Sequence, residues 1–166
     1  MGLWCKVSEN LLAEGETLHR SCLPSSKRYD REHDVFIRWN EYGIDTVYSL
    51  LHWEEARARS ESDLQQALVA HGFESHHYPI SDFGAWDVGE FEEIVGDLDS
   101  ALKEGRRVVV HCHAGVGRTG TLIAGLLISR GTPLAEAVSF IESHGMSVES
   151  HGQRALLERF EAYLEG

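Results

Sequence analysis

The ten residues from His111 to Gly120, HCHAGVGRTG, combine a potential nucleophile, a glycine-containing loop and an arginine. They follow an apolar run at 108–110 and precede a helix-like segment, so the loop would enter a helix N-terminus. The unpaired backbone N–H groups and the positive dipole end of such a terminus bind tetrahedral oxyanions. Arg118, six residues after Cys112, can hold two oxygens of one phosphate with its fork of donors. The pattern predicts a phosphate site with a reactive cysteine.

These surroundings also stabilise a thiolate, so Cys112 is predicted to be a nucleophile that forms a phosphocysteine. Thr119 is placed to donate its hydroxyl to that sulfur, which would help the thiolate leave in a second step. We expect His111 to orient the loop through ring hydrogen bonds, because a thiolate needs no base. The residues expected to bind the substrate are the loop itself and its arginine: His113, Ala114, Gly115, Val116, Gly117 and Arg118.

A leaving phenoxide or alkoxide departs slowly unless it is protonated, so the site needs a general acid, worth about 10² to 10⁴ in rate. Asp82 is the candidate, because it follows a predicted strand that should end at the same sheet edge as the cysteine loop. Asp87 competes with it, but Asp87 and Glu90 together fit a helix capping box. An ionised cysteine and a protonated acid predict a bell-shaped pH profile with its optimum at about pH 5 to 6.

The string at 111–120 resembles the signature loop of protein tyrosine and dual-specificity phosphatases, especially the small and archaeal-type members. The resemblance extends to LHRSCLP at 18–24, GIDTV at 43–47 and YPISDF at 78–83, the last of which is similar to the loop that carries their general acid. It implies hydrolysis of phosphotyrosine in proteins, with phosphoserine and phosphothreonine as further substrates and no cofactor. It also implies that Asp82 is the base of the second step and that Gln153 orients the attacking water.

Other interpretations of these residues compete with this one. His111 and His113 flank Cys112 with the right ligand types for a metal, but no second ligand cluster of recognisable spacing accompanies them, so we expect no metal site. Cys22 could form a protective disulfide with Cys112 on oxidation. With Cys5 the chain has three cysteines, an odd and small number without paired spacing, which suits a reducing compartment. We therefore expect free thiols and a cytoplasmic protein.

The composition limits the partners. The 166 residues contain 15 Lys and Arg against 27 Asp and Glu, a formal net charge of −12, which repels nucleic acid and anionic membranes over long range. No apolar run is long enough to span a membrane. The charge therefore disfavours nucleic acid and membranes as partners, while the resemblance to the phosphatases implies a phosphorylated protein as the partner of a monomer. The alternatives are a non-protein phosphomonoester, such as an inositol phosphate or a nucleotide, and a non-catalytic phosphoprotein-binding module, against which the intact Cys112, Arg118 and Asp82 argue.

Strand-like and helix-like patterns alternate along the chain, with apolar residues throughout, which favours one α/β domain over 1–166. We expect three α/β/α layers around a mostly parallel sheet of four or five strands, with the site at the carboxyl edge of the strands. Strands are predicted at 17–20, 44–51, 73–80 and 108–110, and helices at about 35–42, 64–71, 88–102, 118–129, from 132 onward and 150–164.

Overall fold

The computed structural model describes residues 7–13 and 15–166. In this part of the chain one parallel sheet contains four strands: β1 (Thr17–Ser21), β2 (Thr46–Ser49), β3 (Glu74–His77) and β4 (Arg107–His111). Their order across the sheet is β1-β4-β2-β3, so β4 pairs with a strand on each side. The predicted Cys5 thiol lies outside the described residues.

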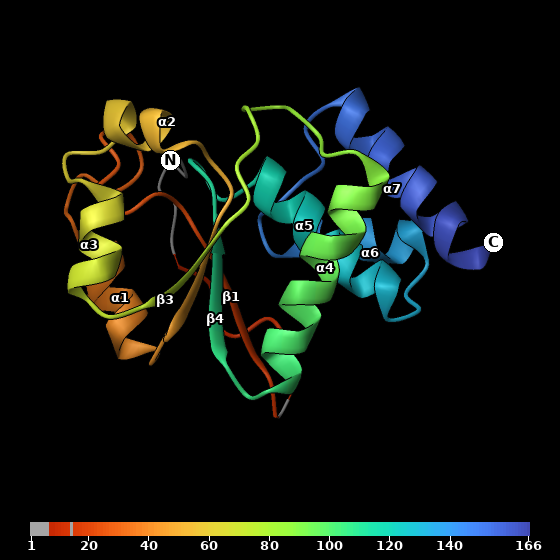
Figure 1. Cartoon of the computed structure of the whole chain (residues 1–166), viewed down its shortest axis with the longest axis horizontal. Coiled ribbons are helices and arrows are strands. Elements are labelled where there is room, and N and C mark those ends of the chain that lie inside the picture. The colour runs from red at the N-terminus through yellow and green to blue at the C-terminus, as the bar shows by residue number, and fades with distance from the viewer. Residues whose placement is uncertain (1–6, 14) are drawn as a thin grey trace.

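Helices cover both faces of the sheet (Figure 1). One face carries α1 (Val35–Glu41), α2 (Trp53–Arg59) and α3 (Leu64–Ala70). The other carries α4 (Val88–Lys103), α5 (Gly117–Ser129), α6 (Leu134–Ser143) and α7 (His151–Glu165). The predicted three-layer α/β/α fold with a parallel sheet is confirmed. Within the described residues no helix is both long and apolar enough to cross a membrane.

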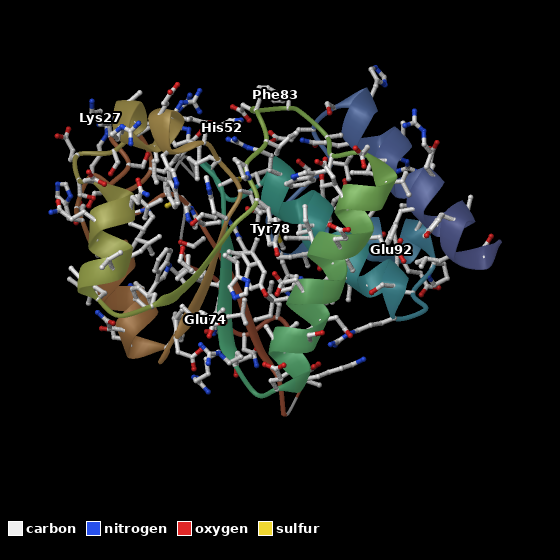
Figure 2. The ribbon with its side chains drawn as sticks, in the orientation of Figure 1. Lys27, His52, Glu74, Tyr78, Phe83 and Glu92 are labelled. Carbon is white, nitrogen blue, oxygen red and sulfur yellow. The ribbon has the colours of Figure 1, made fainter. Side chains whose placement is uncertain are left out.

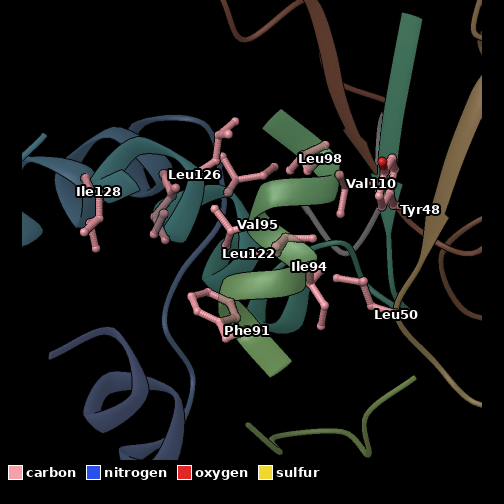
Figure 3. Close-up of a cluster of buried hydrophobic side chains, with 14 of the residues drawn as sticks. Tyr48, Leu50, Phe91, Ile94, Val95, Leu98, Val110, Leu122, Leu126 and Ile128 are labelled. Atoms are coloured by element: carbon pink, nitrogen blue, oxygen red, sulfur yellow. The ribbon is translucent and has the colours of Figure 1, made fainter. Parts of the chain in front are cut away.

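The central strand β4 faces two separate hydrophobic clusters. Val108 and Val110 point into the larger one, under α4 and α5, while Val109 points into the smaller one, under α1 and α3. This alternation follows from the pleat of a strand and explains why 108–110 is an uninterrupted apolar run. Figure 3 shows side chains of α4, α5 and the sheet meeting in the larger cluster, with Phe91 and Leu122 among them.

One helix start and the lengths of two strands were open to prediction from the sequence. Asp87 caps α4, because its carboxylate accepts a hydrogen bond from the Glu90 amide at 2.9 Å. Strands β2 and β3 are shorter than the predicted 44–51 and 73–80, since only four residues of each form the ladder. The helix α2 was not predicted at all.

The topology brings several loops to one edge of the sheet. All four strands are parallel, so their carboxyl ends lie together. His111 ends β4 in register with Ser49 of β2 and Ser21 of β1. Figure 2 shows His52, which follows β2, and Phe83, which follows β3, at this end of the molecule, and Glu74 at the opposite end. The segments after β1, β2, β3 and β4 can therefore contribute to one site, as the sequence predicts.

Candidate active site

The cysteine loop, residues 112–117, runs from the end of β4 to the first turn of α5. Gly115 adopts a left-handed φ of 76°, and a Cβ at this position would lie 2.5 Å from the backbone oxygen of Ser21. Only glycine allows this approach of the loop to the end of β1. The Leu23 amide donates to the His113 carbonyl at 2.9 Å and fixes the same contact. The loop is thus held in a tight turn by the neighbouring strand.

Cys112 lies at the base of this loop and is only 3% exposed. The Thr119 hydroxyl donates a hydrogen bond to the Cys112 sulfur over 3.1 Å, as the sequence analysis expects. Thr119 is itself fully buried in the first turn of α5, where the helix dipole favours negative charge. The sulfur therefore has one hydroxyl donor and the positive end of a helix beside it.

Arg118 is the most constrained side chain of the site, with 1% of its side chain exposed. Its two terminal nitrogens, Nη1 and Nη2, each donate to one carboxylate oxygen of Glu55 at 2.8 Å, and Nη1 also donates to the Ile80 carbonyl at 2.9 Å. Although burial works in the opposite direction, the hydrogen bonds to Glu55 and the nearby charges raise the pKa of Arg118. The guanidinium is a permanent cation in a fixed orientation.

The Nε donor of Arg118 is unusual, because it is buried and has no hydrogen-bond partner among the described residues. Buried polar groups are almost always satisfied, so an orphan of this kind calls for a specific explanation. An oxyanion bound in the cysteine loop would accept this hydrogen bond while Glu55 holds the far side of the guanidinium.

Glu55 is a site residue that the sequence analysis missed, because it lies on the unpredicted helix α2. The sequence WEEARAR has no apolar stripe, but it places acidic residues in the first turn and arginines in the last. That charge pattern suits the helix dipole, and Arg59 forms an i,i+4 ion pair with Glu55 at 3.1 Å. The pattern could have revealed the helix.

Asp82 lies within reach of two arginines at this edge. Its carboxylate oxygens are 3.5 Å from Nη2 of Arg118 and 3.5 Å from Nη1 of Arg59. The side chain is 35% exposed, so it is open to solvent as well as to the site. Phe83, next in the chain, adopts a left-handed φ of 63° and is exposed. The structure brings Asp82 to the cysteine loop and leaves Asp87 as the cap of α4.

His113, the histidine of the cysteine loop, contacts two neighbouring polar side chains. His113 lies between Nη1 of Arg59, 2.8 Å from its Nδ1, and the Ser26 hydroxyl, 3.1 Å from its Nε2. Burial, together with the charge of Arg59, lowers the pKa of His113 to about 4. The ring is therefore neutral near pH 7, and Nδ1 accepts the hydrogen bond of Arg59. Among the described residues no cluster of three or more His, Cys, Asp or Glu side chains is arranged to hold a metal ion.

Gln153, predicted to orient a water, is fully buried at the start of α7. Its Oε1 accepts from the Glu149 amide at 2.8 Å, and its Nε2 donates to the Gly84 carbonyl at 3.3 Å. Both ends of the side chain are thus engaged, one with the turn before α7 and one with the loop that carries Asp82. This arrangement makes Gln153 a link between the two segments.

Cys22, predicted as a disulfide partner, is not bonded to Cys112. Its side chain lies in the smaller cluster with Trp39, whereas Cys112 lies in the larger cluster on the opposite face of the sheet. The two cysteines nevertheless directly follow Ser21 and His111, which are paired on neighbouring strands, so a disulfide formed on oxidation stays a prediction.

A family profile described as "Polymorphic toxin system, DSP-PTPase phosphatase" matches residues 25–132. The chain belongs to this family. Among the solved structures, this DSP-PTPase phosphatase superimposes on Tk-PTP in its active form with a TM-score of 0.73 at 29% identity, covering 98% of this chain and 99% of that one. It also superimposes on kinase associated phosphatase with a TM-score of 0.83, covering 100% and 99% of the two chains, but at 21% identity, which shows a shared fold.

Curated relatives match the DSP-PTPase chain over part of their own length. Cyclin-dependent kinase inhibitor 3 of Rattus norvegicus is 40% identical over 86 residues, which are 52% of this chain and 41% of the relative. Protein tyrosine phosphatase domain-containing protein 1 of Mus musculus is 32% identical over 168 residues, 95% of this chain and 21% of the relative. The chain therefore spans less than half the length of these two relatives.

His111 gives the phosphatase a predictable sensitivity to acid. It is fully buried, with Nε2 2.7 Å from the Ser49 hydroxyl and Nδ1 3.1 Å from the Cys112 carbonyl, and burial lowers its pKa from 6.5 to about 4. The unfolded chain therefore binds a proton at His111 more readily than the folded chain does. The contribution of His111 to stability is complete above pH 6.5 and is lost as the pH falls toward 4. Between pH 7 and pH 5 we expect a loss of about 2 kcal/mol from this residue.

Urea unfolding at both pH values checks this expectation. The fall in the free energy of unfolding between pH 7 and pH 5 should be smaller by about 2 kcal/mol in His111→Gln than in the wild type. His151→Gln, at an exposed position of α7, is the matched control and should keep the wild-type fall. An equal fall in His111→Gln and the wild type would contradict the assignment.

Proposed function

We propose that the protein is a cysteine-dependent phosphatase that hydrolyses phosphotyrosine, and also phosphoserine and phosphothreonine, in proteins. The observation that carries the proposal is the arrangement of Arg118, which is buried, fixed by Glu55 and left with an unpartnered Nε donor. It follows by six residues a cysteine whose sulfur accepts a hydrogen bond from Thr119. A permanent cation, a stabilised thiolate and a helix N-terminus in one loop suit nucleophilic attack on a phosphate.

In the first step the Cys112 thiolate attacks phosphorus, and the bond between phosphorus and the ester oxygen breaks. Arg118 and the backbone N–H groups of the loop hold the phosphoryl oxygens, which gain charge in the transition state. The Asp82 carboxyl group gives its proton to the leaving oxygen. The 3.5 Å separation between Asp82 and Arg118 supports this role, because a substrate phosphate held by the arginine would lie beside the acid.

In the second step water attacks the phosphocysteine and the bond between phosphorus and sulfur breaks. The thiolate leaves with the Thr119 hydroxyl hydrogen-bonded to it, which lowers its basicity as a leaving group. A carboxylate beside the cysteine loop accepts the proton of the water, and Asp82 is the acceptor that the sequence suggests. The cycle returns Cys112 as a thiolate and releases inorganic phosphate.

Release of phosphate from matched phosphotyrosine and phosphothreonine peptides, in the presence of a chelator, tests this function. We expect hydrolysis of both peptides with a preference for phosphotyrosine, inhibition by vanadate and an optimum at about pH 5 to 6. Activity that requires an added metal, or an optimum above pH 8, would contradict the mechanism. Absence of release from both peptides would count against a protein substrate.

A further inference from the structure

Glu149 is a third carboxylate near the cysteine loop, after Glu55 and Asp82, and neither step of the proposed reaction uses it. It lies in the turn before α7, and its carboxylate packs against the backbone of Gly117, directly before Arg118. A Cβ at Gly117 would overlap Oε1 of Glu149 and would lie 2.8 Å from its Cδ. The absence of a side chain at Gly117 therefore lets this carboxylate reach the loop itself.

The backbone of Glu149 is held firmly in this position. Its amide donates to Oε1 of Gln153 at 2.8 Å, while the Ser150 hydroxyl caps α7 by accepting from the Gln153 amide at 3.1 Å. The other end of Gln153 donates to Gly84, two residues after Asp82. Gln153 thus connects the segment that carries Asp82 with the segment that carries Glu149.

The electrostatic surroundings of Glu149 place it beside both the acid and the arginine. Partial burial and the negative charge of Asp82 raise the pKa of Glu149, while Arg118 opposes the rise. Among the described residues, the Glu149 carboxylate has no hydrogen bond and no ion pair, although the residue is exposed to solvent. A carboxylate with a raised pKa is a stronger base than an ordinary one, and this one has free lone pairs at the loop.

We propose that Glu149 is a further catalytic residue of this phosphatase, which binds the water that attacks the phosphocysteine and accepts its proton. The inference rests on the proposed function, and it assigns the proton-acceptor role of the second step to Glu149 in place of Asp82. The oxygen of the water forms a bond to phosphorus, the bond from phosphorus to the Cys112 sulfur breaks with its electron pair remaining on sulfur, and one water proton moves to the Glu149 carboxylate. Glu149 then releases this proton to solvent, and Asp82 takes up a proton from solvent, which restores the acid of the first step. Gln153, with both ends of its side chain engaged, acts by positioning Glu149.

The test separates the two steps of the reaction. With p-nitrophenyl phosphate as the probe, nitrophenolate release reports formation of the phosphocysteine, and turnover reports its hydrolysis. In Glu149→Gln we expect an initial burst of nitrophenolate of nearly one per enzyme and a kcat lowered by about 10²-fold, with kcat/KM within a few-fold of wild type. Acid quenching followed by mass spectrometry should find phosphate accumulated on Cys112.

Control variants make the outcome specific. Glu158→Gln makes the same change on an exposed part of α7 and should behave as the wild type. Asp82→Asn should slow the burst itself, and Glu149→Asp should recover part of the lost kcat. The inference is overturned if the only effect of Glu149→Gln is a higher kcat/KM, because that is the effect of removing a negative charge that repels the phosphate. It is also overturned if the variant slows the burst without accumulation of phosphocysteine. A wild type that forms no phosphocysteine would overturn the proposed function itself.

Discussion

Replacing Cys112 with serine is expected to lower kcat/KM for a phosphotyrosine peptide by on the order of 10⁴ to 10⁶-fold. A serine hydroxyl is not ionised near neutral pH, so it needs a base to become a nucleophile. The neighbouring His111 cannot supply one, because Nδ1 faces the Cys112 carbonyl and Nε2 faces the Ser49 hydroxyl. The dipole of α5 and the Thr119 hydroxyl stabilise a thiolate but remove no proton.

Binding should survive this substitution, because Arg118 and the backbone of the loop are unchanged. We expect the dissociation constant of the phosphopeptide, measured by fluorescence anisotropy, to stay within a few-fold of the KM-derived affinity of the wild type. Cys22→Ala is the matched control at a buried cysteine of the other cluster, and it should retain catalysis if it folds, as circular dichroism would verify. Substantial turnover by Cys112→Ser would rule out the phosphocysteine mechanism.

Short sequence patterns predict much of this fold. The apolar run at 108–110 predicted a central strand because only a strand covered on both faces tolerates such a run, and β4 has that position. Asp87 predicted the start of α4 because its side chain can satisfy a free amide of the first turn. The cysteine loop was recognisable because its glycines, cysteine and arginine serve one local geometry. In each case the residues that decide the structure are neighbours in the chain.

The support of the site depends on contacts between distant residues, which local patterns do not reveal. Glu55 and Arg118 lie 63 residues apart and meet only because the loop after β2 and the loop after β4 share one sheet edge. Gln153 resembled a water-orienting residue, but the structure engages its amide oxygen with a backbone amide four residues earlier. Ser150 and Gln153 have the spacing of a capping box, which accounts for the hydrogen bond from the Gln153 amide to the Ser150 hydroxyl. The box would pair the Gln153 side chain with the Ser150 amide, however, and not with the amide of Glu149.

The Glu55 contact leads to the second large effect, on Arg118→Lys. Lysine preserves the charge but cannot donate to both Glu55 oxygens and also present a side donor to a phosphate oxygen. Loss of two charge-assisted hydrogen bonds from this side chain to the phosphate, at about 1.5 to 3 kcal/mol each, predicts a fall in kcat/KM of about 10² to 10⁴-fold. Steady-state kinetics with the phosphotyrosine peptide measure this fall.

Glu55→Gln is the comparison that assigns the effect to orientation of the guanidinium. It leaves Arg118 and its unpartnered Nε in place but weakens the bidentate support, so we expect kcat/KM to fall by only about 10-fold. Combining Glu55→Gln with Arg118→Lys should cost less than the sum of the two effects, because lysine makes little use of the glutamate's second oxygen. Full additivity of the two losses would show that Glu55 acts on catalysis by another route than Arg118.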